Sequence, residues 1–207
     1  GTIEDPVEYR LPGINQIGAD NDHGLGFANG LKYIMRQDPD VIMVGEIRDH
    51  ETAGIAVQAA LTGHLLISTL HTNDSVGAVT RLHDLGVDRF KVAGALLGSV
   101  AQRLLLSICP QCKQHCAPND KLLESLAVNG KVPANATFYH GRGCRKCLNT
   151  GYFGRIPIFE IMTVTSELAN AIEQGASLNG LREIALAGGM RPLAAAGLER
   201  VLAGRTT

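Results

Sequence analysis

Four of the five cysteines fall into two Cys-x-x-Cys pairs separated by a polar stretch. Two residues between paired cysteines allow both thiolates to reach one tetrahedral ion, so the two pairs predict a shared metal. Four thiolates close the coordination sphere, so the expected zinc is structural. The predicted ligands are Cys109, Cys112, Cys144 and Cys147. Neighbouring His115 and Cys116 are expected outside this set, and metal-free or redox-active thiols are the alternatives.

Polar side chains follow three short apolar runs that have the pattern of β-strands. In chain order they are Glu4, Asp5 and Glu8 after residues 2–3, Glu46, Arg48 and Asp49 after residues 41–44, and His71 after residues 65–70. Ligands of parallel sheets bind beyond the carboxyl ends of the strands. Carboxylates suit Mg²⁺ and water, and an imidazole can donate to phosphate oxygens. Each residue alone is more typical of a helix cap or a solvated loop, but three strand ends together predict a site for a metal-bound phosphate.

The elements that position these groups alternate between strand and helix patterns. The β-branched run at 41–44 is typical of a strand buried on both faces, and residues 65–70 form a second run. Helical spacing over 25–35 and 51–61 places helices before and between them, and Ser75 can cap a third helix that ends at Gly86. Strand, helix and strand in this order predict an α/β fold with a parallel sheet.

The second half of the chain changes in composition. Residues 92–106 have the pattern of a long buried helix, and residues 109–147 are rich in polar residues and carry both cysteine pairs. A β-rich segment is expected at 153–162, and short helices near 166–174, 178–187 and 193–202. We therefore expect three parts: an α/β core at 1–108, a metal-binding subdomain at 109–150, and a strand and helical subdomain at 151–207.

Composition excludes several classes of protein. The net charge of −1, the 4% aromatic content and the absence of Trp do not favour a nucleic-acid binder. The residues show no secretory signal pattern, and the most apolar stretch is too short and too polar to span a membrane. Paired cysteines without an export signal favour a reducing, cytoplasmic setting.

Three longer motifs resemble those of the ATPases of type II secretion and type IV pilus assembly. The chain contains IEDPVEY at 3–9, RQDPDVIMVGEIRD at 36–49 and TGHLLISTLHTN at 62–73. They resemble the aspartate box, the Walker B segment and the histidine box of that family, in the same order. The resemblance covers essentially the whole chain and implies a RecA-like fold, a homo-hexameric ring and hydrolysis of ATP with Mg²⁺.

The resemblance also implies roles for individual side chains. Glu8 would position or activate the attacking water, Glu46 would hold Mg²⁺, and His71 would sense the γ-phosphate. Nothing in the sequence fixes whether Glu8 or Glu46 is the general base. The supporting residues that it implies are Glu4 and Asp5 in the aspartate box, Arg48 and Asp49 after Walker B, and His64 at the other end of the histidine-box strand. Apart from the resemblance, Arg81 follows the histidine box and is a candidate contact for nucleotide or a neighbouring subunit, with a solvated helix face as the alternative.

The phosphate-binding loop G-x-x-x-x-G-K-[ST] does not occur in the 207 residues. In the family this loop lies upstream of the aspartate box, so we expect the chain to be a C-terminal fragment of an ATPase, inactive alone. We also expect an exposed sheet edge near Ile3, where upstream strands would pair.

The four cysteines narrow the function that the resemblance implies. Assembly and secretion ATPases carry a tetracysteine insertion, whereas pilus retraction ATPases lack it. The cysteines therefore favour secretion or pilus extension over retraction. The segment DSVGAVTRL at 74–82 favours type II secretion, with pilus extension as the alternative. Contact with inner-membrane platform components would be made mainly by N-terminal domains. The chain would then lie in the cytoplasm, at the inner membrane through its partners.

Two other functions are alternatives to the motor. A zinc-ribbon module that binds nucleic acid has slight support from Tyr139, His140, Arg142, Arg145 and Lys146. That module leaves the three strand-end motifs unexplained. A catalytically inactive scaffold would describe the fragment rather than its parent.

Overall fold

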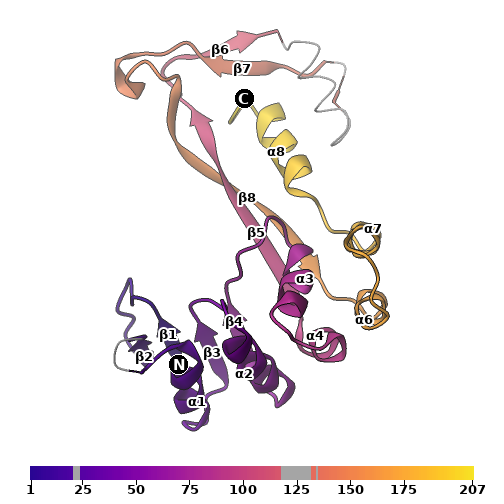
Figure 1. Ribbon diagram of the computed structural model, residues 1–207. Coiled ribbons are helices and arrows are strands. Elements are labelled where there is room, and N and C mark those ends of the chain that lie inside the picture. The colour runs from indigo at the N-terminus through magenta and orange to yellow at the C-terminus, as the bar shows by residue number, and fades with distance from the viewer. Residues whose placement is uncertain (21–23, 118–131, 134) are drawn as a thin grey trace. The chain divides into compact units, whose positions relative to one another are not determined.

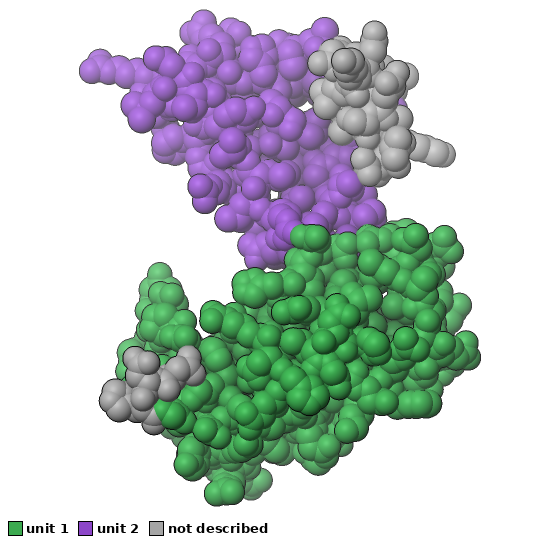
Figure 2. Space-filling view, in the orientation of Figure 1, with its two compact units in different colours: residues 1–99, 163–188 green, residues 100–162, 189–207 purple. Residues whose placement is uncertain are grey.

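A computed structural model describes residues 1–20, 24–117, 132–133 and 135–207 (Figure 1). The chain forms two compact units, which Figure 2 distinguishes by colour. The first comprises residues 1–99 and 163–188, and the second comprises residues 100–162 and 189–207. In the described residues, no helix has the length and apolar character that crossing a membrane requires.

The first unit is built on a four-stranded parallel sheet. Its strands, in spatial order, are β2 (Gln16–Gly18), β1 (Thr2–Glu4), β3 (Val41–Val44) and β4 (Leu65–Ser68). Val44 pairs in register with Ile3 on one side and with Ser68 on the other. The carboxyl ends of β1, β3 and β4 therefore meet at one edge, and the predicted α/β fold with a parallel sheet is confirmed.

Helices complete the first unit, and the first two of them pack against the sheet. They are α1 (Phe27–Met35), α2 (His50–Leu61), α3 (Gly77–Asp84), α4 (Arg89–Ala95), α6 (Ser166–Glu173) and α7 (Leu178–Ala187). Ile3 and Ile42 are fully buried, as is Leu31 of α1. Helix α1 approaches β1 so closely that a Cβ at Gly30 would collide with the Ile3 side chain.

One face of the sheet is open in the described residues, so the expectation that β3 is buried on both faces is wrong. Val41 and Leu65 are register partners and are 45% and 47% exposed, and Ile67 beside Met43 is 52% exposed. These side chains share one face because residues two apart on a strand point the same way. A β-branched run shows strand propensity but does not report how many faces are covered.

The expected free edge at Ile3 is also wrong. Strand β1 is interior, with β2 on one side and β3 on the other. Within the described sheet, the outer strands are β2 and β4. The three-residue strand β2 is too short to give a period-2 signal, so the sequence does not reveal the partner that covers β1.

The second unit contains two small sheets and one helix. Strands β5 (Gly98–Ile108) and β8 (Tyr152–Thr163), which begin and end at the boundary between the units, form one sheet. Strands β6 (Lys113–Cys116) and β7 (Phe138–Gly141) pair antiparallel in the other. Helix α8 (Leu193–Leu202) follows, and its first amide donates to the buried carboxylate of Glu160 on β8 at 3.1 Å.

The long helix expected over 92–106 is not present. Helix α4 ends at Ala95, and β5 begins at Gly98. Gly94 and Gly98 both weaken a helix, and the leucines at 104–106 suit a strand as well. Pairing with β8, more than 40 residues along the chain, decides the outcome.

Candidate nucleotide site and cysteine cluster

The strand-end site centres on Glu46, directly after β3. Its carboxylate contacts Arg48 in an ion pair, and its Oε2 lies 3.3 Å from His71 Nε2, at the end of β4. The Glu46 side chain is 15% exposed, whereas that of His71 is 82% exposed. Adjacent parallel strands thus bring together two side chains that are 25 residues apart in sequence.

Backbone contacts fix the two segments that carry this pair. The Thr69 hydroxyl donates to the Gly45 carbonyl at 2.7 Å, and the Ile47 amide donates to the Thr69 carbonyl at 3.1 Å. The chain after β3 is therefore tied to the chain after β4. Thr69 belongs to this framework, although no pattern in the sequence singles it out.

Hydrogen bonds favour the ionised form of Glu46. The Arg48 guanidinium, with a smaller contribution from His71, lowers the pKa of the Glu46 carboxyl below its ordinary value, and this outweighs the partial burial. Glu46 is therefore an ionised acceptor near neutral pH. An ionised, half-buried carboxylate beside an imidazole fits the donor set expected for a metal-bound phosphate.

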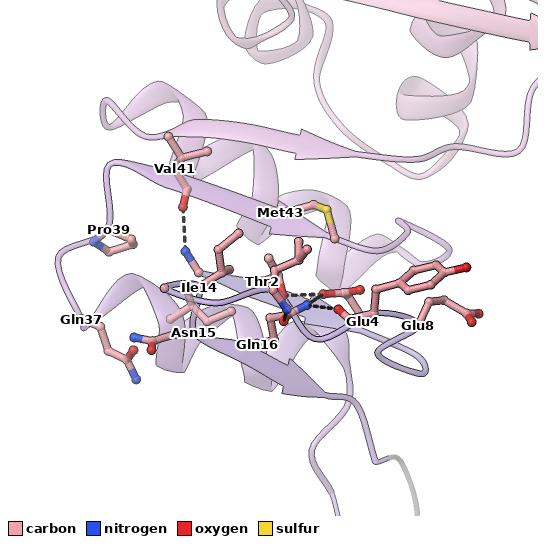
Figure 3. A pocket seen from close by; sticks show the side chains of 15 residues that line it. Thr2, Glu4, Glu8, Ile14, Asn15, Gln16, Gln37, Pro39, Val41 and Met43 are labelled. Atoms are coloured by element: carbon pink, nitrogen blue, oxygen red, sulfur yellow. Dashed lines mark hydrogen bonds between the residues drawn. The ribbon is translucent and has the colours of Figure 1, made fainter.

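The aspartate-box carboxylates lie on the open side of the sheet. Glu4 Oε1 accepts from the Thr2 hydroxyl at 2.6 Å and from Gln16 Nε2 at 3.1 Å, and these bonds lower the pKa of Glu4. Glu4 and Glu8 line a cavity of about 620 Å³, which Figure 3 shows from close by. Glu8 is exposed, and neither Glu46 nor His71 is among the residues that line this cavity. The structure therefore places Glu8 near Glu4 rather than in contact with the Glu46–His71 pair.

Other predicted residues have structural partners of their own. Asp49 caps α2, accepting from the Thr52 amide at 2.8 Å and from the Thr52 hydroxyl at 2.9 Å. His64 lies before β4, at the opposite end of that strand from His71, and its Nδ1 is 3.0 Å from the Ala59 carbonyl.

Of the other predicted residues, Asp5 lies at the surface and Arg81 lies on α3. Asp5 is exposed after β1, and its charge acts on Arg48 from a distance. Arg81 is half-buried on α3, and its Nε atom is buried without a hydrogen-bond partner among the described residues.

The four predicted metal ligands converge in the second unit. One potential ligand atom from each of Cys109, Cys112, Cys144 and Cys147 lies within 4.8 Å of every other. Three Sγ–Sγ distances are 3.7–3.8 Å, far longer than the about 2.05 Å of a disulfide. A tetrahedron with Zn–S bonds of about 2.3 Å has edges of about 3.8 Å. The cluster therefore fits a tetrahedral ion of the size of zinc.

Backbone donors prepare the cluster for negative charge. Although burial opposes ionisation, the amides of Cys144 and Gly151, which donate to Cys147 Sγ at 3.2 and 3.3 Å, lower the pKa of the Cys147 thiol to about 6. Burial raises the pKa of Cys112 to about 12. A cation that binds both thiolates would offset the cost of ionising the second one.

His115 and Cys116 lie outside the group of converging ligands, on β6. The His115 ring packs on Tyr139 of β7, with ring centroids 4.6 Å apart. The Nζ atom of Lys113 lies 4.0 Å from the centroid of the same ring, and Lys146 lies over Phe153. These aromatic rings are thus already in contact with side chains of the protein.

Comparison with known proteins agrees with this geometry. A family model for type II/IV secretion system proteins matches residues 1–207. The chain is 48% identical to the type IV pilus assembly ATPase PilB of Thermus thermophilus, and the match covers 100% of this chain and 23% of that protein. It is 46% identical to the type II secretion system protein E of Dickeya dadantii, covering 100% of this chain and 40% of that protein.

A solved structure shows the same fold. The pilus retraction motor PilT with bound ADP matches with a TM-score of 0.69 at 27% identity, and the match covers 100% of this chain and 49% of that one. The chain thus spans less than half the length of each of these relatives. Matched along its whole length by the family model, the chain belongs to the type II/IV secretion system protein family.

Proposed function

We propose that this chain is part of a motor ATPase that powers type II secretion by driving assembly of a pseudopilus. The observation that carries the proposal is the 3.3 Å approach of His71 to the ionised Glu46 at the ends of adjacent strands. Relatives named as ATPases of type II secretion and of type IV pilus assembly support the class of function. Both systems are represented among them, so pilus extension is the second candidate.

Each residue of the site has a chemical role in this proposal. Bound Mg²⁺ would neutralise phosphate charge and polarise the bond that breaks. Glu46 would accept hydrogen bonds from metal-bound water, and His71 would donate to a phosphate oxygen. Glu8, exposed and without a structural partner in the described chain, is free to orient and deprotonate the attacking water. Arg48 would stabilise the ionised form of Glu46.

The cysteine cluster supports a zinc-stabilised motor over a nucleic-acid-binding module. Four cysteines held at tetrahedral spacing close the site and leave no position for catalysis. Binding of single-stranded nucleic acid would need free aromatic faces. Tyr139 instead packs against Lys113 and His115. We propose that Zn²⁺ holds this part of the second unit together.

The proposed setting follows from the family resemblance. The whole protein would form a homo-hexamer in the cytoplasm, held at the inner membrane by platform proteins. ATP would bind with the help of the phosphate loop, which the 207 residues do not contain. The chain alone is therefore proposed to be inactive.

Substitutions in the whole protein test the assigned roles. Glu8→Gln should remove hydrolysis while ATP binding stays within about twofold of wild type, because the lost group acts on water. Glu46→Gln should weaken the Mg²⁺-dependent steps as well. Glu51→Gln is the matched control, since Glu51 is an exposed carboxylate paired with Lys32 at 2.7 Å. Wild-type turnover by the Glu8→Gln protein would refute the assigned role of Glu8.

The choice between the two systems needs a separate experiment. The whole gene can be expressed in strains that lack either the secretion ATPase or the pilus extension ATPase. Restored secretion without restored piliation is the expected result. Restored piliation alone would overturn the choice of secretion and favour pilus extension.

A further inference from the structure

An ion pair joins helix α7 to the histidine loop, which we define as residues 69–77. Arg182 Nη2 donates to Asp74 Oδ2 at 2.7 Å, across 108 positions of sequence. The two side chains are 33% and 23% exposed, so water and salt screen this pair less than a fully exposed one. Arg182 carries no motif signal and was not among the residues predicted for the site.

Asp74 organises the turn that follows His71. Its Oδ1 accepts from the Gly77 amide, the first residue of α3, at 2.8 Å. Its backbone carbonyl accepts from the Thr72 hydroxyl at 3.0 Å. One carboxylate oxygen thus binds the first amide of α3 while the other binds Arg182, so the guanidinium helps to orient the carboxylate that closes the loop.

His71 lies between two anchors of the histidine loop. The upstream anchor is Thr69, whose hydroxyl is bonded to Gly45. The downstream anchor is Asp74 with Arg182. The His71 side chain is 82% exposed, so little packing fixes its ring. Its approach to Glu46 therefore depends on the backbone that these two anchors hold.

Helix α7 is a fixed base for Arg182. The Ser177 hydroxyl caps the helix through the Gly180 amide at 3.2 Å, and Leu181, next to Arg182, is 2% exposed. Helix α7 packs on α6, and α6 packs on α4. The turn at Gly175 after α6 lies directly against the Arg89 side chain of α4. The guanidinium therefore projects from a helix that the first unit holds in place.

We propose that Arg182 is a positioning residue for the nucleotide site, which holds Asp74 so that the histidine loop presents His71 to Glu46. This inference rests on the proposed function, because the loop matters for hydrolysis only if His71 contacts the phosphate. It links helix α7 to the strand ends within the first unit. Removal of Arg182 should leave the fold intact and loosen residues 71–77.

Amide hydrogen exchange of the 207-residue chain tests whether Arg182 holds Asp74, and it does not require ATP hydrolysis. Arg182→Met removes the charge and keeps an unbranched stem. It should speed exchange at the Gly77 amide about fivefold, as expected for loss of a partly shielded pair, while the amide of Ala53 in α2 stays unchanged. Arg182→Lys should restore protection in part. Arg191→Met is the matched control, because it removes the exposed pair with Glu199 on α8.

The rate of ATP hydrolysis by the whole protein tests the positioning role of Arg182. Arg182→Met should lower kcat about tenfold, with a smaller change in KM for ATP, because a misplaced group costs mainly the chemical step. Asp74→Asn should have a similar effect, and the double variant should be no worse than the worse single one.

Separate outcomes distinguish this inference from the proposed function. Unchanged exchange at Gly77 would overturn the anchor, and faster exchange with wild-type kcat would overturn the positioning role. Additive losses in the double variant would also overturn it. If the wild-type whole protein hydrolyses no ATP, the proposed function fails, while the exchange experiment still decides whether Arg182 holds the loop.

Discussion

The cysteine cluster and the strand-end site differ in how much of each the chain itself supplies. The cluster has four ligands from two tight turns, three of them buried, with sulfur spacings that match a tetrahedral ion. The strand-end site offers an ionised carboxylate and an exposed imidazole, beside an open sheet face. A closed structural site can be complete within a short segment, whereas a site for a phosphate needs donors from several elements.

Local order in the two sites reflects this difference. Backbone amides point at Cys147 Sγ and favour its thiolate before any ion binds. At the strand ends, Arg48 and His71 already contact Glu46, so side chains of the protein itself hold this carboxylate. The cysteine cluster is therefore arranged to bind a cation. At the strand-end site, the carboxylate is already in contact with side chains of the protein.

The largest effect should come from breaking the closed site. Cys147→Ser should abolish the binding of about one zinc per chain and unfold residues around β6 and β7, since apparent zinc affinities of zinc-finger peptides correspond to about 10–16 kcal/mol. Elemental analysis and amide exchange measure both effects. Cys116→Ser should keep the metal. Full zinc content in Cys147→Ser would contradict the ligand set.

A pair of matched substitutions compares the covered and open faces of the sheet. Ile42→Ala should destabilise the first unit by about 2–5 kcal/mol, because Ile42 is fully buried. Ile67→Ala, which removes the same atoms from the neighbouring strand, should cost about 1 kcal/mol or less, because Ile67 is 52% exposed. Urea unfolding measures both free energies. Equal losses would show that the second face is covered in solution.

The smallest effect concerns Asp49, which the family resemblance placed in the nucleotide site and the structure places at the start of α2. Asp49→Ala should cost about 1 kcal/mol of unfolding free energy, and Asp49→Ser should recover most of it, as for other helix caps. Thermal or urea unfolding of the two variants decides this. If serine is as damaging as alanine, capping does not explain the residue.

Features set by short-range patterns were predicted well from the sequence. The cysteine spacing gave the converging cluster, and the bounds of α7 and α8 match the expected helices at 178–187 and 193–202. The polar residues that follow the predicted strands were expected to lie close together, because parallel strands align their carboxyl ends, and Glu46 and His71 are in contact.

Features set by distant partners could not be predicted. The segment at 98–108 is a strand because β8 pairs with it, and its leucines satisfy a helical period equally well. The Arg182–Asp74 pair joins positions 108 residues apart and has no local pattern. The division into parts at 1–108, 109–150 and 151–207 remains a prediction, as do the roles of Glu8 and His71.

Calorimetric titration of Mg-ATP into the zinc-loaded 207-residue chain tests the contrast between the two sites most directly. We expect no micromolar binding, because Glu4, Glu8 and Glu46 place negative charge near the strand ends and the 207 residues contain no phosphate loop. The metal should remain bound throughout. Micromolar binding of Mg-ATP would contradict the account, because it would mean that the strand-end site is complete within this chain.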